Sequence, residues 1–332
     1  MSKQFQIPAG DAQQRGASGL VVPALDAITG VPVDGAPPRP RRSPPRALLR
    51  AMRPKQWTKN VLVAAAPGGA GVLTHSTAAG KTALAFAAFC LVSSATYLFN
   101  DIGDREEDRR HPEKRDRPIA AGELSARAAA VAAVVLLIAG LGIAASLRLA
   151  FVGLLAGYLA VTLAYTVWLK HVAVFDIAVV ASGFIFRAVA GGLAVDVPIS
   201  RWFLIVTSFG SLFIVAGKRY SEHITMGAER ETTRATLATY SRDYLRYVWT
   251  MASAVTLGGY FLWAFEQSKL EGSIPWFELS IAPFTMGILR YALLLDEGAG
   301  GAPEEIVLRD RPLQLLGLMW LIVYGAGVSV VH

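Results

Sequence analysis

Long apolar stretches constrain the fold of this chain more than any other feature of its sequence. Stretches of 18 or more mostly apolar residues recur from Val61 to Val331. Each is long enough to cross a hydrocarbon core of about 30 Å as an α-helix. Charged residues make up 17% of the 332 residues, whereas soluble domains usually carry about 25%. The sequence therefore predicts an all-α, polytopic membrane protein.

Nine segments are expected to span the membrane, with boundaries defined to within about two to four residues. The first contains Pro67, Gly68 and Gly69, which a spanning helix tolerates where neighbouring helices cover its backbone. The nine expected spans are 57–75, 82–100, 124–146, 148–168, 172–192, 199–217, 244–265, 274–296 and 313–331.

The N-terminal residues 1–45 differ from the rest of the chain. They are rich in Pro, Gly, Ala and Arg and show no apolar period, so they lack the hydrophobic surface that would offset the entropy of ordering. We interpret them as a disordered, basic cytoplasmic arm, with no signal-peptide pattern. Residues 46–332 then form a single nine-helix membrane domain.

Positive charge falls on alternate connections, which predicts the orientation. The arm and the loops 101–123 and 218–243 are rich in Lys and Arg, whereas the loops between them carry few. The positive-inside rule therefore places the N-terminus in the cytoplasm and predicts a multi-pass protein of the plasma (inner) membrane. The net charge of +7 does not indicate nucleic-acid binding, because basic residues between spans fix topology and attract anionic lipids. The single cysteine, Cys90, excludes an internal disulfide and argues against a cysteine-based metal site.

An acidic loop after the second span carries the clearest chemical signal. Asp101, Asp104 and Asp108 directly follow an apolar helix. If that helix continues, all three carboxylates lie on one face. Close like charges need a compensating cation, and Mg²⁺ commonly joins carboxylates to substrate phosphates. The loop therefore predicts a Mg²⁺-bound diphosphate site at the cytoplasmic face. The alternative is a solvated loop of mixed charges, which we favour for Glu106 and Arg109.

The segment Asn100-Asp101-x-x-Asp104-x-x-x-Asp108, followed by HPEKRDRPIAAG, resembles the first aspartate-rich motif of the UbiA superfamily of intramembrane prenyltransferases. The resemblance covers roughly residues 47–331 and includes the sequence RPKQW that begins at Arg53. It implies a helical bundle with a central cavity that opens sideways to lipid. It also suggests a homo-oligomer, although no sequence pattern marks an interface.

The chain departs from the aromatic prenyltransferases of that superfamily, which carry a second aspartate-rich motif, typically DxxxD. Here the segment YTVWLKHVAVFD offers Tyr165, Lys170 and a lone Asp176. Arg187 follows eleven residues later, about three helical turns on, and a charged pair within a membrane helix is a functional signal by default. Two alternatives stay open. The pair is a structural ion pair, or Asp176 holds a second metal or orients Arg187.

The sequences RPKQWTKN, GFIFRAVAGGLA and GKRYSE, together with the acidic loop, resemble the decaprenyl-phosphate phosphoribosyltransferase branch of the superfamily. This resemblance implies transfer of 5-phosphoribose from phosphoribosyl pyrophosphate to decaprenyl phosphate in the membrane, for cell-wall arabinan synthesis. Pyrophosphate would leave and decaprenyl-phosphoryl ribose 5-phosphate would form. The alternatives are an aromatic prenyltransferase that uses an isoprenyl diphosphate, and a transporter, for which we find none of the expected internal repeats.

The expected site residues divide into two sets by role. Asp101, Asp104 and Asp108 bind Mg²⁺ and form the catalytic set together with Asp176 and Arg187. The residues expected to bind substrate are Lys55, Lys59, Asn100, Arg105, Lys114, Arg117, Tyr165, Lys170, Lys218 and Arg219.

Overall fold

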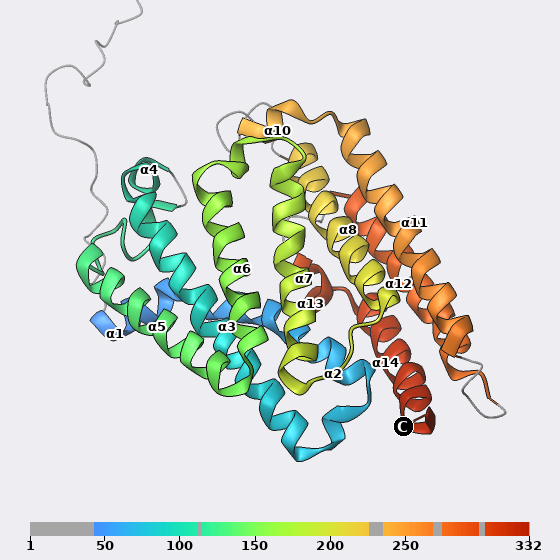
Figure 1. Ribbon diagram of the computed structural model, residues 1–332. Helices are drawn as coiled ribbons and strands as arrows, with labels where there is room; N and C mark the ends of the chain where they lie inside the picture. Colours follow the sequence, from blue (N-terminus) through green and yellow to red (C-terminus); the bar gives the residue numbers. More distant parts are fainter. Residues whose placement is uncertain (1–42, 112–113, 226–234, 268–273, 299–302, 332) are drawn as a thin grey trace, which may run out of the picture. The chain divides into compact units, whose positions relative to one another are not determined.

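Helices account for all the regular secondary structure of the described residues (Figure 1). The structure is a computed structural model that describes residues 43–111, 114–225, 235–267, 274–298 and 303–331, all within one structural unit. Eight helices are long and apolar enough to cross a membrane. They are α3 (Ser76–Gly103), α5 (Ala126–Leu147), α6 (Leu149–Val167), α7 (Phe175–Val195), α8 (Arg201–Thr225), α11 (Arg242–Gln267), α12 (Trp276–Asp296) and α14 (Arg311–Val331).

Short helices join or precede these eight. Five are α-helical and four are 3₁₀ turns or segments. They are α1 (Pro44–Ala51), η2 (Pro54–Ala64), α2 (Ala65–Gly69), η3 (Val72–Thr74), α4 (Arg105–Arg110), η4 (Lys114–Asp116), η5 (Leu169–His171), α10 (Ala235–Thr239) and α13 (Pro303–Arg309).

The first expected span, residues 57–75, differs from the prediction. It is not one long helix but the succession of η2, α2 and η3. Gly71 adopts φ +67°, in the left-handed region, and interrupts the segment before η3. The remaining eight expected spans each correspond to one long helix. The Pro and Gly residues that made this span irregular in the sequence thus end its helices early.

The broken segment packs against α7 at a glycine. A Cβ atom added to Gly191 would lie 1.7 Å from the carbonyl oxygen of Val63 and 2.9 Å from Pro67. The absence of a side chain at this position therefore lets the two backbones touch, as small residues do between membrane helices. This contact holds η2 and α2 against α7.

Small residues also bring the other helices together, while large apolar side chains face outward. Gly140 of α5 lies against α3, where an added Cβ would approach Val92 to 2.7 Å. On the opposite face of α5, Val131 and Ile138 are about two-thirds exposed. Apolar side chains on that outer face are what a lipid-facing surface requires.

The α3–α4 turn, the link from α6 to α7 and α10 lie at the same end of the bundle (Figure 1). The α3–α4 turn and α10 belong to the loops 101–123 and 218–243, which carry the positive charge in the sequence. Of the predicted basic arm, residues 1–45, all but the last three residues lie outside the described residues, and α1 begins at Pro44. The disorder of the arm stays a prediction.

Candidate active site

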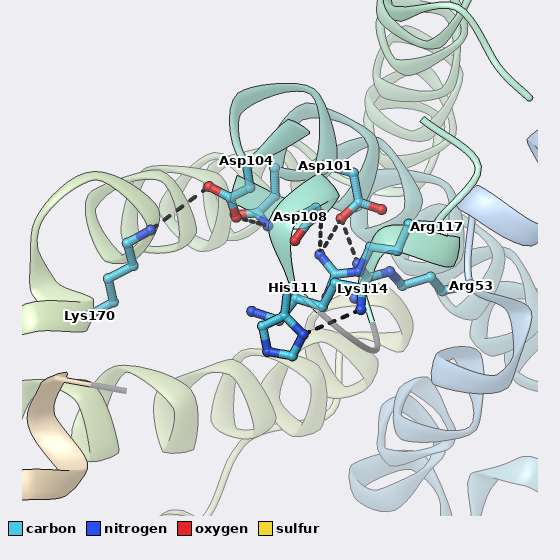
Figure 2. A network of polar contacts seen from close by, with 9 residues as sticks. Arg53, Asp101, Asp104, Asp108, His111, Lys114, Arg117 and Lys170 are labelled. Carbon is cyan, nitrogen blue, oxygen red and sulfur yellow. Dashed lines mark hydrogen bonds and ion pairs between the residues drawn. The ribbon is translucent and has the colours of Figure 1, made fainter. Parts of the chain in front are cut away.

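Two of the three predicted aspartates form a buried cluster. Asp101 lies in the last turn of α3 and Asp108 in α4, and each side chain is 2% exposed. Between them lies Arg117, whose Nη1 is 3.2 Å from Asp101 Oδ1 and 2.7 Å from Asp108 Oδ2 (Figure 2). One guanidinium thus offsets the repulsion of two carboxylates that would otherwise face each other.

A second arginine, Arg53, contacts the same oxygen of Asp101 as Arg117 does. Arg53 Nη2 lies 2.6 Å from Asp101 Oδ1, and its guanidinium carbon lies 4.9 Å from the ring centre of Tyr97. Arg53 has φ +54°, a left-handed conformation at the turn that begins η2. Arg53 was not among the predicted site residues, and no local pattern links it to Asp101, which lies 48 positions away.

The third aspartate is directed elsewhere. The prediction that all three share one helical face is wrong, because α3 ends at Gly103 and α4 begins after Asp104. Asp104 accepts a hydrogen bond from Asn100 Nδ2 at 2.9 Å. Its other oxygen lies 3.9 Å from Lys170 Nζ, and 27% of its side chain is exposed. Figure 2 shows Asp104 and Lys170 apart from the Asp101–Asp108 pair.

These donors suit Mg²⁺ as part of a larger site and not as a complete cage. Among the described residues, no three Asp, Glu, His or Cys side chains converge on one point that could hold a metal ion. Mg²⁺ commonly takes one or two carboxylates and completes its shell with substrate phosphates and water. Asp104 provides an accessible carboxylate with Asn100 beside it, so the residues present fit that mode. A site made of all three aspartates stays a prediction.

Asp176 belongs to a separate polar cluster at the same end of the bundle. It lies in the first turn of α7 and is 1% exposed. Thr236 donates a hydrogen bond to its Oδ2 at 3.2 Å, Tyr240 donates one to its Oδ1, and Arg219 Nε lies 3.5 Å from Oδ2. Burial, followed by this hydrogen bond to a carboxylate, raises the pKa of Tyr240 well above its ordinary value of about 10. Tyr240 therefore keeps its proton and remains a hydrogen-bond donor at every physiological pH.

Arg187 does not pair with Asp176, and that prediction was wrong. Eleven residues along a helix correspond to about 16 Å of rise, so the two side chains share a face without meeting. Arg187 instead donates to Asn60 Oδ1 at 2.7 Å, to the Gly183 carbonyl at 2.6 Å and to the Tyr158 hydroxyl at 3.3 Å. It fixes η2 against α7 within the bundle.

A cavity of about 1240 Å³ lies between residues 58–73 and helices α7, α8, α11, α12 and α14. Lys59, Tyr165, Lys218 and Arg219 are among its lining residues, and Arg219 contacts Asp176, which in turn contacts Thr236 of α10. Aromatic side chains line much of the remaining wall: Trp202, Phe203, Tyr260, Trp263, Phe277, Phe284, Trp320 and Tyr324. The cavity thus combines an apolar interior with cationic side chains in its wall.

The structure brings four predicted substrate-binding residues to that cavity, whereas Lys55, Arg105 and Lys114 are not among its lining residues. Lys218 and Arg219 do not end the sixth span as expected, because α8 continues to Thr225. Lys55 is exposed on η2. The Lys114 backbone N–H donates to His111 at 3.4 Å. Arg105 has a buried Nε with no hydrogen-bond partner among the described residues.

Comparison with known proteins identifies the family. Residues 61–307 match the UbiA prenyltransferase family. The chain belongs to the UbiA prenyltransferase family. UbiA-family relatives include a protein of Mycobacterium tuberculosis that is 46% identical over 286 residues, covering 85% of this chain and 94% of the relative. A Corynebacterium glutamicum relative is 44% identical over 290 residues, covering 85% and 87%. Both are named decaprenyl-phosphate phosphoribosyltransferase.

Solved structures show the same UbiA-family fold. A UbiA homologue from Archaeoglobus fulgidus, bound to DMAPP and Mg²⁺, superposes with a TM-score of 0.65 at 17% identity and covers 86% of this chain and 99% of that one. A homologue from Aeropyrum pernix superposes with a TM-score of 0.55 at 19% identity, covering 84% and 98%. These likenesses confirm the expected all-helical membrane bundle.

Proposed function

We propose that this UbiA-family protein transfers 5-phosphoribose from phosphoribosyl pyrophosphate to decaprenyl phosphate. The products are decaprenyl-phosphoryl ribose 5-phosphate, used for cell-wall arabinan, and pyrophosphate. The observation that carries the proposal is a large, mostly apolar cavity with the cationic side chains of Lys218 and Arg219 in its wall. The names of relatives that are 44–46% identical support the choice of substrates.

The donor diphosphate is assigned to the aspartate loop. Asp104 and Asn100 would hold Mg²⁺ together with the diphosphate, and Lys170 lies 3.9 Å from Asp104, where it could meet phosphate oxygens. Bound Mg²⁺ would neutralise charge on the leaving group. Arg117 and Arg53 keep Asp101 and Asp108 in place.

The reaction needs no strong base from the protein. An ionised oxygen of the lipid phosphate forms the new bond to ribose C1 while the bond from C1 to the pyrophosphate oxygen breaks. The sugar develops oxocarbenium character as that bond lengthens, as in glycoside cleavage. The cationic side chains contribute by holding both phosphates in position and by stabilising the charge that leaves.

The membrane setting follows from the same residues. The apolar cavity would hold the decaprenyl chain, because its walls are predominantly aliphatic and aromatic side chains. The basic connections support a cytoplasmic position for the site in the plasma membrane, where soluble phosphoribosyl pyrophosphate has access to it.

The test is to measure pyrophosphate release by purified protein with a panel of substrates in Mg²⁺. Release should require both phosphoribosyl pyrophosphate and decaprenyl phosphate, and each alone should give only background. Turnover with an isoprenyl diphosphate and an aromatic acceptor, and none with phosphoribosyl pyrophosphate, would assign the protein to the aromatic prenyltransferases instead.

A further inference from the structure

The carboxylate of Asp176, in α7, contacts side chains from α8 and from the α10 segment. Thr236 of α10 and Tyr240, just after it, donate hydrogen bonds to its two oxygens. Arg219 of α8 lies 3.5 Å from one of them. We call these four residues the Asp176 clasp. It joins α8, the start of α7 and the α10 segment, and its Arg219 lines the cavity.

The Tyr240 hydroxyl acts as both an acceptor and a donor of hydrogen bonds in this clasp. The hydroxyl accepts a hydrogen bond from the backbone N–H of Val174 at 2.5 Å and donates to Asp176. Val174 has φ +71°, a conformation that a β-branched residue rarely adopts and that surrounding contacts must maintain. The clasp thus fixes the link before α7 as well as the carboxylate.

Arg219 is the member of the clasp that faces the cavity. Its side chain is 3% exposed, and its Nη1 donates to Glu222 Oε2 at 3.1 Å. Its Nε finds no hydrogen-bond partner among the described residues, since 3.5 Å to Asp176 is too long for a good bond. That donor is directed at Asp176, so the contribution of Arg219 to the cavity is the positive charge of a guanidinium in its wall, a group suited to binding phosphate.

The shape and charge of the cavity define the ligand. Lys218 precedes Arg219 on α8 and also lines the cavity, as does Lys59, and the rest of the wall is mostly apolar. A phosphate attached to a long apolar chain would match both the cationic side chains and the apolar wall of the cavity. The donor residues Asp104 and Lys170 do not line this cavity, so the two substrates would be held by different side chains.

We propose that Arg219 binds the phosphate of the lipid acceptor, and that Asp176, Thr236 and Tyr240 are positioning residues that aim Arg219 into the cavity. This assignment rests on the proposed function. It gives Asp176 a role that needs neither a second metal ion nor Arg187. It also gives α10 a role, because two of the three positioning side chains come from that segment.

Direct binding to the purified full chain, with no donor present, tests the first part. Arg219→Gln should weaken decaprenyl phosphate binding about 10- to 100-fold, as expected for lost hydrogen bonds to a charged group. The same variant should leave binding of decaprenol, which lacks the phosphate, unchanged. Equal weakening for both lipids would overturn the assignment, as would inorganic phosphate that competes as strongly as the lipid phosphate.

Steady-state kinetics test the positioning residues. Tyr240→Phe and Thr236→Val keep the side-chain shapes and should raise the KM for decaprenyl phosphate about threefold to tenfold, as expected for one lost hydrogen bond. The KM for phosphoribosyl pyrophosphate should stay constant. Tyr244→Phe is the matched control, because its ring stacks on Tyr240 at 5.6 Å, and it should change neither value.

The two proposals fail in distinguishable ways. A parallel rise in both KM values, or a fall in kcat alone, for Tyr240→Phe would overturn the positioning role. If the unmutated protein transfers no phosphoribose, the reaction assigned above is wrong, while the lipid-binding comparison still decides the role of Arg219. If Asp176→Asn does not fold, Tyr240→Phe and Thr236→Val decide the role of the clasp.

Discussion

At the scale of single residues, the aspartate loop depends on arginines that neutralise it. Asp101 and Asp108 are buried, and Arg117 is the side chain that contacts both. Two buried carboxylates without a cation would repel each other, and removing one partner of a buried ion pair costs more than the pair contributes. Arg117 is therefore expected to be a stability residue as well as a neighbour of substrate.

Replacement of Arg117 tests this interpretation. Arg117→Met should destabilise the purified protein by on the order of 3 kcal/mol, because both carboxylates lose their shared partner. Asp108→Asn in the same chain should recover part of that loss, which thermal unfolding in detergent would measure as a double-mutant cycle. Strictly additive effects of the two substitutions would contradict the shared ion pair.

Tyr240 gives a prediction about pH. Its pKa in the folded protein is raised, chiefly by burial, so its contribution to stability is complete below the unfolded pKa of about 10 and is lost as pH rises towards the folded pKa. The melting temperature of the unmutated protein should fall between pH 9 and pH 11. The melting temperature of Tyr240→Phe should fall less over the same range. Equal losses in both proteins would show that Tyr240 does not carry this pH dependence.

The sequence revealed part of the site because charged residues in a membrane protein are rare enough to stand out. The aspartates and Lys170 were predicted in this way, and Lys170 does lie beside Asp104. Arg53 and Tyr240 were missed because their partners are 48 and 64 positions away. An ion pair between distant elements leaves no local pattern, so only the fold could reveal it.

At the scale of elements, the long apolar stretches predicted eight helices well. The predicted helix bounds were wrong where a helix breaks or where it continues past charged residues. Residues 57–75 were expected as one span, but this part of the chain forms η2, α2 and η3, with an interruption at Gly71. Helix α8 was expected to end before Lys218 but continues to Thr225. Apolarity marks the part of a helix in contact with lipid or core, whereas the helix itself extends as far as its backbone hydrogen bonds do.

The contact between the broken segment and α7 yields a sharp prediction. Gly191→Ala should destabilise the protein by at least about 3 kcal/mol, because the new Cβ would overlap the Val63 carbonyl and backbone cannot yield as a side chain can. Gly153→Ala is the control, since nothing lies within 4 Å of its added Cβ. Comparable melting temperatures for the two variants would contradict the close approach of η2 to α7.

At the scale of the whole molecule, the aspartate loop and the apolar cavity are built from different helices. The aspartate loop joins α3 to α5, and the apolar cavity lies among α7, α8, α11, α12 and α14. Arg187 and Asn60 fix η2, which reaches from Arg53 at the aspartates to Lys59 at the cavity. The membrane class and eight of the nine expected spans followed from the long apolar stretches, but this arrangement did not.

The most direct test of the account is transfer of ribose-labelled phosphoribosyl pyrophosphate into decaprenyl phosphate by purified protein in Mg²⁺, counted in the organic phase. Three proteins are compared: the unmutated chain, Asp104→Asn, and Glu106→Gln as a control from the same loop that pairs with Arg109. We expect label in lipid for the unmutated chain and for Glu106→Gln, and a loss of at least about 100-fold for Asp104→Asn. No label with the unmutated chain, or undiminished label with Asp104→Asn, would contradict the account.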